Sequence, residues 1–131
     1  MQQNPQYADV VREVREHLLA RIAYAAENGI GPERIVADPG IGFGKTLEHN
    51  LALLRGLPEL AGCGRPLLVG ASRKRFIGEV TGRAAPDARE AGSLGVAAWS
   101  ILHRAHILRV HDVIGTCDVC RMLDRLGGGE Q

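Results

Sequence analysis

Arginine and histidine side chains that could bind an anion stand at the end of a short apolar run. Arg109 and His111 close the run 107–110 and are two residues apart, so on a strand both side chains project to the same side. Two cationic or ionisable groups that converge at a strand end favour a phosphate or a diphosphate as ligand. The plainer alternative for this pair is a network of salt bridges at the surface.

A carboxylate, Asp38, directly follows another apolar run, 35–37. Burying it there would be costly unless hydrogen bonds satisfy it. Its two oxygens could accept two parallel bonds from a planar, amidine-like pair of N–H groups on a ligand. The alternative is a helix cap or an acceptor that fixes the loop. A third polar group, Ser72-Arg73-Lys74, follows the run 67–69.

The stretch from Asp38 to Thr46, DPGIGFGKT, ends like a phosphate-binding P-loop but does not fit the spacing of one. Pro39, which has no N–H to donate, stands where that pattern needs its first glycine. Lys45 stands where a dinucleotide-binding pattern needs its third glycine. We therefore expect neither nucleotide site, and treat Gly-Lys-Thr as a coincidence. The glycines instead let the backbone approach a ligand and hold Phe43 out on a flexible loop.

Helices and short apolar strands alternate along the chain, which predicts a parallel sheet covered by helices. Two layouts remain open, a doubly wound sheet or part of a (β/α)8 barrel, and both place active-site residues at the carboxyl ends of strands. We expect a single unit over 1–126 and a flexible tail over 127–131. The predicted helices run from Asn4-Pro5 to Asn28-Gly29, from Thr46 to near Gly56 and Pro58, over 89–104 and over 116–126, and the predicted strands are 35–37, 67–69 and 107–110.

The composition excludes several classes of protein. The 131 residues carry 16 basic and 15 acidic side chains, a net charge of +1, which gives no general electrostatic case for nucleic acid or an anionic membrane. No apolar run approaches the roughly 20 residues of a membrane span. Three cysteines argue for a reducing compartment rather than a disulfide scaffold, so we expect a cytoplasmic protein.

Two of the cysteines, Cys117 and Cys120, form a C-x-x-C pair near the start of a predicted helix. A redox dithiol commonly occupies a helix N-terminus, where the helix dipole lowers the pKa of a thiol. A zinc site would need further ligands, and the sequence holds no second cysteine pair. We favour the interpretation that both are simply small residues of the helix.

Three segments resemble the signature segments of dihydropteroate synthase. They are DPGIGFGK from Asp38, GASRKRFIG from Gly70 and RVHDV from Arg109, in the order that the family has at the ends of its sixth, seventh and eighth barrel strands. The stretch EHNLALLRGL resembles it too, and the resemblance covers nearly the whole chain. It implies an α/β fold that is the C-terminal part of a (β/α)8 TIM barrel, with three parallel strands and flanking helices.

The resemblance also implies an activity, the condensation of 6-hydroxymethyl-7,8-dihydropterin diphosphate with p-aminobenzoate, and a family that sulfonamide drugs target. Asp38 and Lys74 would bind the pterin, and Arg109 with His111 would hold the diphosphate. Phe43 and Ser72 would line the aminobenzoate site. In full, the resemblance assigns substrate binding to Asp38, Gly42, Phe43, Ser72, Arg73, Lys74, Arg109 and His111, catalysis to Lys74, Arg109 and His111, and no metal ligand.

A full barrel takes roughly 250 residues, so the sequence offers only part of one. The resemblance places the main Mg²⁺ ligand in the absent N-terminal half. It also implies a homodimer or oligomer through the helices that follow Thr46, Asp87 and Thr116. An internal start, a gene fragment or a truncated chain would each give this sequence. A folate-binding barrel of the methyltransferase type and an inactive half-barrel stay open as alternatives, although Ser72-Arg73-Lys74 favours the synthase.

Overall fold

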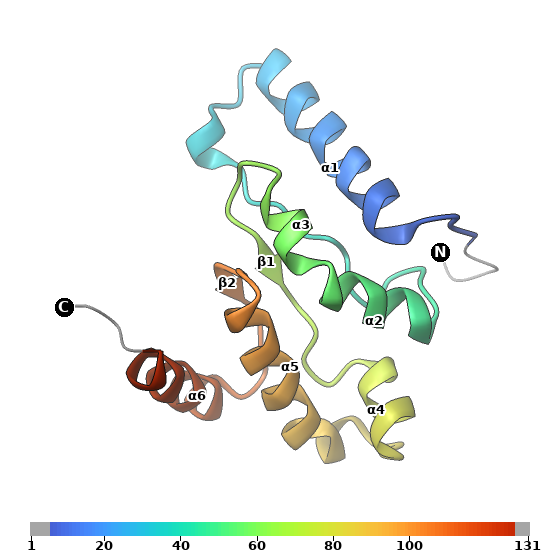
Figure 1. Cartoon of the computed structure of the whole chain (residues 1–131), viewed down its shortest axis with the longest axis vertical. Helices are drawn as coiled ribbons and strands as arrows, with labels where there is room; N and C mark the ends of the chain where they lie inside the picture. The colour runs from blue at the N-terminus through green and yellow to red at the C-terminus, as the bar shows by residue number, and fades with distance from the viewer. Residues whose placement is uncertain (1–5, 128–131) are drawn as a thin grey trace.

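The computed structural model describes residues 6–127. Within that range short strands alternate with helices, as predicted, and Figure 1 shows the strands between α1 at one end of the molecule and α6 towards the other. Two 3₁₀ helices, Pro32–Arg34 and Pro86–Arg89, join longer elements. The elements are α1 (Val10–Glu27), α2 (Leu47–Arg55), α3 (Leu57–Ala61), β1 (Leu68–Val69), α4 (Arg75–Thr81), α5 (Glu90–Leu102), β2 (Ile107–Leu108) and α6 (Val113–Leu126).

The sheet is parallel, and its order follows the chain. β1 pairs with β2 in the register Leu68 to Ile107 and Val69 to Leu108. On the other side of β1, Ala37 forms a parallel bridge with Leu67. Helices connect each of these segments to the next, so all three carboxyl ends lie at one edge of the sheet.

The predicted strand 35–37 is wrong in extent, because it is reduced to that single bridge. The amide of Ala37 donates to the Pro66 carbonyl at 2.9 Å, and the Ala37 carbonyl accepts from Leu68 at 2.8 Å. Pro39 and Pro66 have no N–H, so neither can add a bond to the ladder. The strand 107–110 is shortened as well, although the Arg109 amide still donates to Val69 at 3.0 Å.

The predicted helix start at Asn4-Pro5 is also wrong. Those two residues lie outside the described range, and residues 6–9 are not helical. The helix begins at Val10, because the Asp9 side chain accepts from the Arg12 amide at 3.1 Å and caps it. The predicted tail 127–131 lies outside the described residues except for Gly127, which caps α6.

The sequence reasoning missed two helices and placed another too late. α3 begins directly after Gly56, and Pro58 falls in its first turn, where no N–H is needed, so Pro58 does not simply end a helix. α4 begins directly after Lys74, in a part of the chain for which no helix was predicted. α6 begins at Val113 rather than Thr116, because Asp112 accepts from the Gly115 amide at 2.9 Å and caps it.

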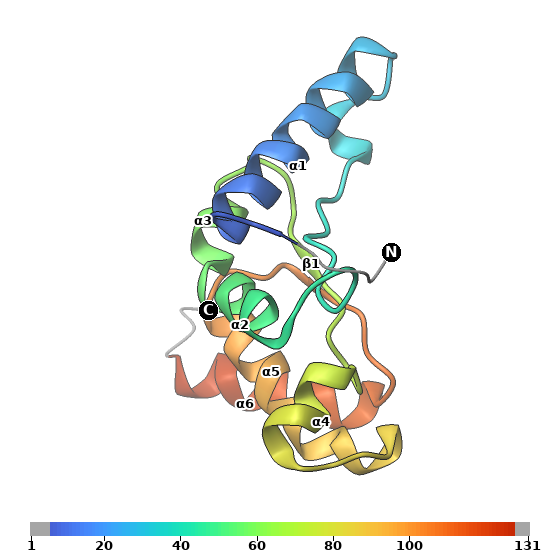
Figure 2. The same ribbon diagram turned by 90° about the vertical axis from the view of Figure 1, so that its right-hand side faces the viewer.

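The core lies between helices α1 to α3 and β1. Leu53, Leu57, Leu60 and Leu67 are each 0% exposed. Helix α1 packs on α2 and α3 with its apolar stripe. Figure 2 shows the backbones of the three helices from a second side. The Trp99 indole donates to the Leu54 carbonyl at 2.8 Å and ties α5 to α2. Among residues 6–127, no helix has both the length and the apolar character that crossing a bilayer requires.

Candidate active site

The predicted site residues come from three loops at the carboxyl edge of the sheet, and most of them border two cavities. One cavity of about 290 Å³ holds the groups predicted to bind an anion. A second cavity of about 460 Å³ lies beside the glycine-rich loop and includes Gly42 and Phe43. Lys74 borders both. The smaller cavity is lined by Gly70, Ser72, Lys74, Arg109, Val110 and His111.

Arg109 and His111 share the smaller cavity although the strand ends before them. A Cβ added at Gly70 would lie 3.0 Å from both Nε and Nη2 of Arg109, so the guanidinium lies directly against the backbone of the neighbouring strand end. The His111 Nδ1 atom is 3.0 Å from the Ser72 hydroxyl, which also accepts from the His111 amide at 3.4 Å. A guanidinium, an imidazole and a hydroxyl therefore surround one space that would suit an anion.

Lys74 links the two cavities. Its amine donates to the Ile41 carbonyl and lies 4.1 Å from the centroid of the Phe43 ring, a cation–π contact. A Cβ at Gly42 would lie 2.5 Å from the Lys74 side chain, so this glycine is needed for the close approach. Partial burial lowers the pKa of Lys74, and the positive charge of Arg109 adds to that effect, while the Asp38 carboxylate opposes it.

The glycine-rich loop is fastened by two side chains that the sequence reasoning did not assign. Lys45 donates to the carbonyls of Gly40 at 2.9 Å and Phe43 at 3.1 Å. The buried Asn50 accepts from the Gly42 amide at 2.6 Å. Lys45 therefore closes the loop that presents Phe43, a structural role that the sequence analysis did not assign to it.

Asp38 is exposed, so its carboxylate avoids the cost that burial would carry. Its Oδ1 atom accepts from the Gly40 amide at 2.8 Å, so it acts as an acceptor that fixes the turn. Burial lowers the pKa of both Lys45 and Lys74, and the nearby Asp38 carboxylate offsets part of that lowering. It can thus serve the loop and still present an oxygen to a ligand.

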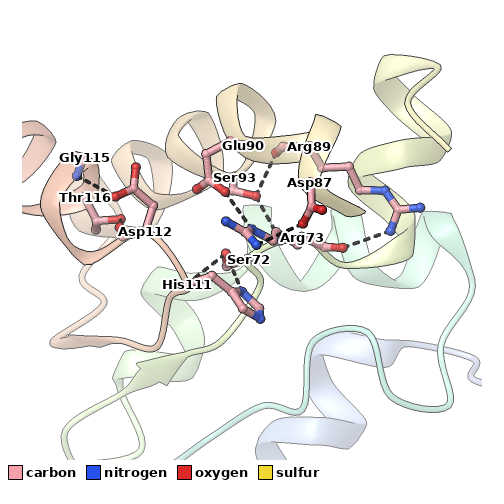
Figure 3. Close-up of polar contacts among 10 residues, drawn as sticks. All are labelled: Ser72, Arg73, Asp87, Arg89, Glu90, Ser93, His111, Asp112, Gly115 and Thr116. Carbon is pink, nitrogen blue, oxygen red and sulfur yellow. Dashed lines mark hydrogen bonds and ion pairs between the residues drawn. The ribbon is translucent and has the colours of Figure 1, made fainter. Parts of the chain in front are cut away.

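Arg73 points to α5 rather than joining Lys74 at the cavity, as Figure 3 shows. Its Nε atom donates to Glu90 at 2.8 Å, and one Nη atom donates to Asp87 at 3.1 Å. The structure thus separates Arg73 from its neighbours Ser72 and Lys74, which border the smaller cavity. A substrate contact by Arg73 stays a prediction.

Comparison with known proteins identifies the family. The profile of the family described as pterin binding enzyme matches residues 1–111. The chain belongs to this family of pterin-binding enzymes. A dihydropteroate synthase from Neisseria meningitidis serogroup C is 51% identical over 128 residues, which are 97% of this chain and 45% of that protein.

Solved structures of pterin-binding enzymes agree. Dihydropteroate synthase from Xanthomonas albilineans in complex with 7,8-dihydropteroate matches with a TM-score of 0.95 and 42% identity over 99% of this chain and 50% of that one. The enzyme from Thermus thermophilus in complex with 6HMPPP matches with a TM-score of 0.90 and 44% identity over 96% of this chain and 50% of that one. The chain spans about half the length of these relatives. The prediction of a partial TIM barrel, rather than an open doubly wound sheet, is confirmed.

Cys117 and Cys120 lie beyond the first turn of α6. The earlier start of α6 makes Cys117 the fifth residue of the helix, so the end of the helix dipole does not act on it directly. Within the described residues both thiols are free, as is the buried Cys63. This placement supports the structural interpretation of the pair over a redox dithiol.

Proposed function

We propose that this chain carries the C-terminal half of a dihydropteroate synthase active site. The reaction would join 6-hydroxymethyl-7,8-dihydropterin diphosphate to p-aminobenzoate and release diphosphate. The observation that carries the proposal is the convergence of Ser72, Lys74, Arg109 and His111 on one cavity at the carboxyl edge of the sheet. Relatives that are named dihydropteroate synthase, and that match nearly the whole chain, support it.

Arg109 and His111 would bind the diphosphate and stabilise its charge as it leaves. The bond between the pterin methylene carbon and the diphosphate oxygen would break first, which leaves a methylene cation that the pterin ring stabilises. Negative charge then grows on the departing oxygens, where cationic donors fixed in advance lower the barrier most. The Arg109 guanidinium supplies such a charge, and the Ser72 contact holds the His111 ring towards the same space.

Asp38 and Lys74 would bind the pterin. The planar N–H pair of an amino-pyrimidine edge matches the acceptor oxygens of a carboxylate, and the exposed Asp38 can offer one. The Lys74 amine would give up its present hydrogen bond to the Ile41 carbonyl and donate to the pterin ring instead.

The aminobenzoate would bind where the larger cavity meets Phe43. The Phe43 ring is half exposed and held by the Lys45-fastened loop, so it can pack on the aromatic ring of the second substrate. Gly42 would complete this side of the pocket, whereas Ser72 would reach the aminobenzoate only from the smaller cavity that it borders. The arylamine nitrogen would then attack the methylene cation, form the new carbon–nitrogen bond and lose a proton.

Within residues 6–127, no three His, Cys, Asp or Glu side chains are grouped so that they could hold a metal ion. We propose that the main Mg²⁺ ligand belongs to the other half of the barrel. We further propose a cytoplasmic location and self-association through α2, α5 and α6.

The test completes the barrel by joining the first half of the Neisseria relative to this chain. Formation of 7,8-dihydropteroate is then measured for the joined protein, for the joined protein with Arg109→Ala, and for the 131-residue chain alone. We expect turnover in the first, a loss of at least about 100-fold in the second and negligible turnover in the third. A folded, joined protein that binds pterin but does not turn over would favour the non-catalytic alternative.

A further inference from the structure

Arg73 has an unusual backbone conformation at the centre of the segment that delivers Ser72 and Lys74. Its φ angle is +59°, in the left-handed region that residues other than glycine rarely occupy. Such a conformation persists only where the surroundings hold it in place. The contacts that hold it come from the start of α5.

Both backbone groups of Arg73 are bonded to α5 or to the residue before it. The Arg73 amide donates to the Ser93 hydroxyl at 2.9 Å, and the Arg73 carbonyl accepts from an Nη atom of Arg89 at 2.9 Å. Ser93 is 6% exposed, and its hydroxyl donates in turn to the Arg89 carbonyl at 2.8 Å. The hydroxyl is therefore used as acceptor and donor at once, which fixes its orientation (Figure 3).

The Arg73 side chain is tied to the same helix. Its Nε atom donates to Glu90 at 2.8 Å, an ion pair in which both side chains are only about a third exposed or less (30% and 27%). The bond to Asp87 adds little, because that carboxylate is 91% exposed. The two neighbours of Arg73 turn the other way, Ser72 to His111 and Lys74 to the Ile41 carbonyl.

We propose that Arg73 is a positioning residue rather than a substrate ligand, and that Ser93, Arg89 and Glu90 act through it to aim Ser72 and Lys74 at the candidate site. The inference rests on the proposed function for what those two residues do. The geometry itself does not depend on the reaction. Contacts from the start of α5 hold Arg73, which stands between Ser72 and Lys74.

The first test measures hydrogen exchange of the Arg73 amide in the 131-residue chain. Ser93→Ala removes the side-chain acceptor of that amide, so we expect exchange to quicken about tenfold. Ser100→Ala is the matched control, because Ser100 is buried in the same helix and its hydroxyl donates to the Val96 carbonyl of that helix. Equal exchange of the Arg73 amide in the two variants would overturn the inference.

The second test measures whether Ser93→Ala changes the surroundings of Lys74 at the cavity. The chain has two lysines, Lys45 and Lys74, so the side-chain NMR signals are simple to assign. Releasing the loop lets water reach the Lys74 amine, and its pKa should then rise towards the ordinary 10.5 in Ser93→Ala. The pKa of Lys45, whose bonds to Gly40 and Phe43 do not involve the Arg73 segment, should move much less. An unchanged Lys74 pKa would contradict a positioning role.

A second pair of variants keeps the inference testable if Ser93→Ala fails to fold. Glu90→Ala removes the partner of the Arg73 side chain, whereas Glu90→Gln keeps an acceptor at the same place. We expect the Lys74 pKa to rise in the first and to return close to the wild-type value in the second. Loss of a negative charge alone would lower the pKa of the amine, so a Lys74 pKa that falls or stays unchanged in Glu90→Ala would overturn the part of Glu90 in the inference.

Neither of these measurements uses turnover, so the inference and the proposed function can fail separately. In the joined protein, Arg73→Ala and Glu90→Ala should each lower kcat/KM. The double variant should lower it no further than either single variant, because each of the three proteins lacks the same Arg73–Glu90 ion pair. A further loss from Arg73→Ala in the Glu90→Ala background would show a direct substrate contact and overturn the positioning role.

Discussion

At the residue scale, charges in the candidate site are arranged around Lys74. Its amine contacts the Ile41 carbonyl and the Phe43 ring, with Asp38 as the nearby negative charge and Arg109 as a positive one. Neutralising one member should therefore alter the others. The sequence could identify these side chains by type and by their place after apolar runs. The sequence could not show that Lys45 fastens the loop beside these side chains. Its bond to the Gly40 carbonyl forms only because the glycine-rich loop folds back on itself.

We predict that Asp38→Asn in the joined protein weakens pterin binding much more than aminobenzoate binding. The amide replaces one acceptor oxygen with a donor, so one of two parallel bonds becomes a donor–donor contact that costs about 1–3 kcal/mol. Calorimetric titration with each substrate measures both affinities. Asp118→Asn, at an exposed ion pair of α6, is the control. An unchanged pterin affinity would show that Asp38 only fixes its turn.

Lys74 should also make stability depend on alkaline pH. Burial lowers its folded-state pKa below the ordinary 10.5, so between those two values the unfolded chain binds more protons than the folded chain. The free energy of unfolding should therefore rise with pH across that window. Lys74→Met removes this contribution, and urea titrations at several pH values should show a smaller slope. An identical slope in the variant would contradict the lowered pKa.

At the scale of elements, the order of helices and strands could be predicted, but their ends could not. Alternating apolar runs located the three segments of the sheet, because buried parallel strands are apolar throughout. Their lengths depend on ladder bonds that Pro39 and Pro66 cannot make, and helix starts depend on which acidic side chain reaches an amide. The direction in which Arg73 points, towards α5, depends on hydrogen-bond partners 16 to 20 residues away along the chain. No local sequence pattern indicates those partners.

The Asp112 cap gives a test at this scale. Asp112 starts α6 directly after His111, so losing the cap should destabilise that helix by about 1 kcal/mol, within the usual range for caps. Thermal unfolding of Asp112→Ala should show a lower midpoint than the chain itself. Asp118→Ala, on the same helix and bonded to the exposed Arg121, should change the midpoint much less. A midpoint equal to that of the control would mean that the cap contributes nothing.

At the scale of the whole molecule, apolar side chains remain exposed at the sheet and on the outer helices. Val36 and Ile107 are 47% and 39% exposed at the two sides of the sheet. Ile114 and Leu126 on α6 are 79% and 75% exposed. Open strand edges and exposed apolar groups favour pairing with other chains.

We therefore predict that the isolated chain either self-associates or has low stability. Sedimentation velocity over a range of concentrations, combined with urea unfolding, measures both properties. Association that covers these surfaces should make the unfolding midpoint increase with protein concentration. A highly stable monomer at all concentrations would contradict this expectation.

The central claim, that this half-barrel holds the leaving diphosphate, is tested most directly by a crystal structure of the joined protein with pyrophosphate. The account predicts an anion within hydrogen-bonding distance of both Arg109 and His111, in the cavity that they share with Ser72 and Lys74. Pyrophosphate bound elsewhere in the barrel, or Arg109 and His111 turned to opposite faces of the sheet, would contradict it.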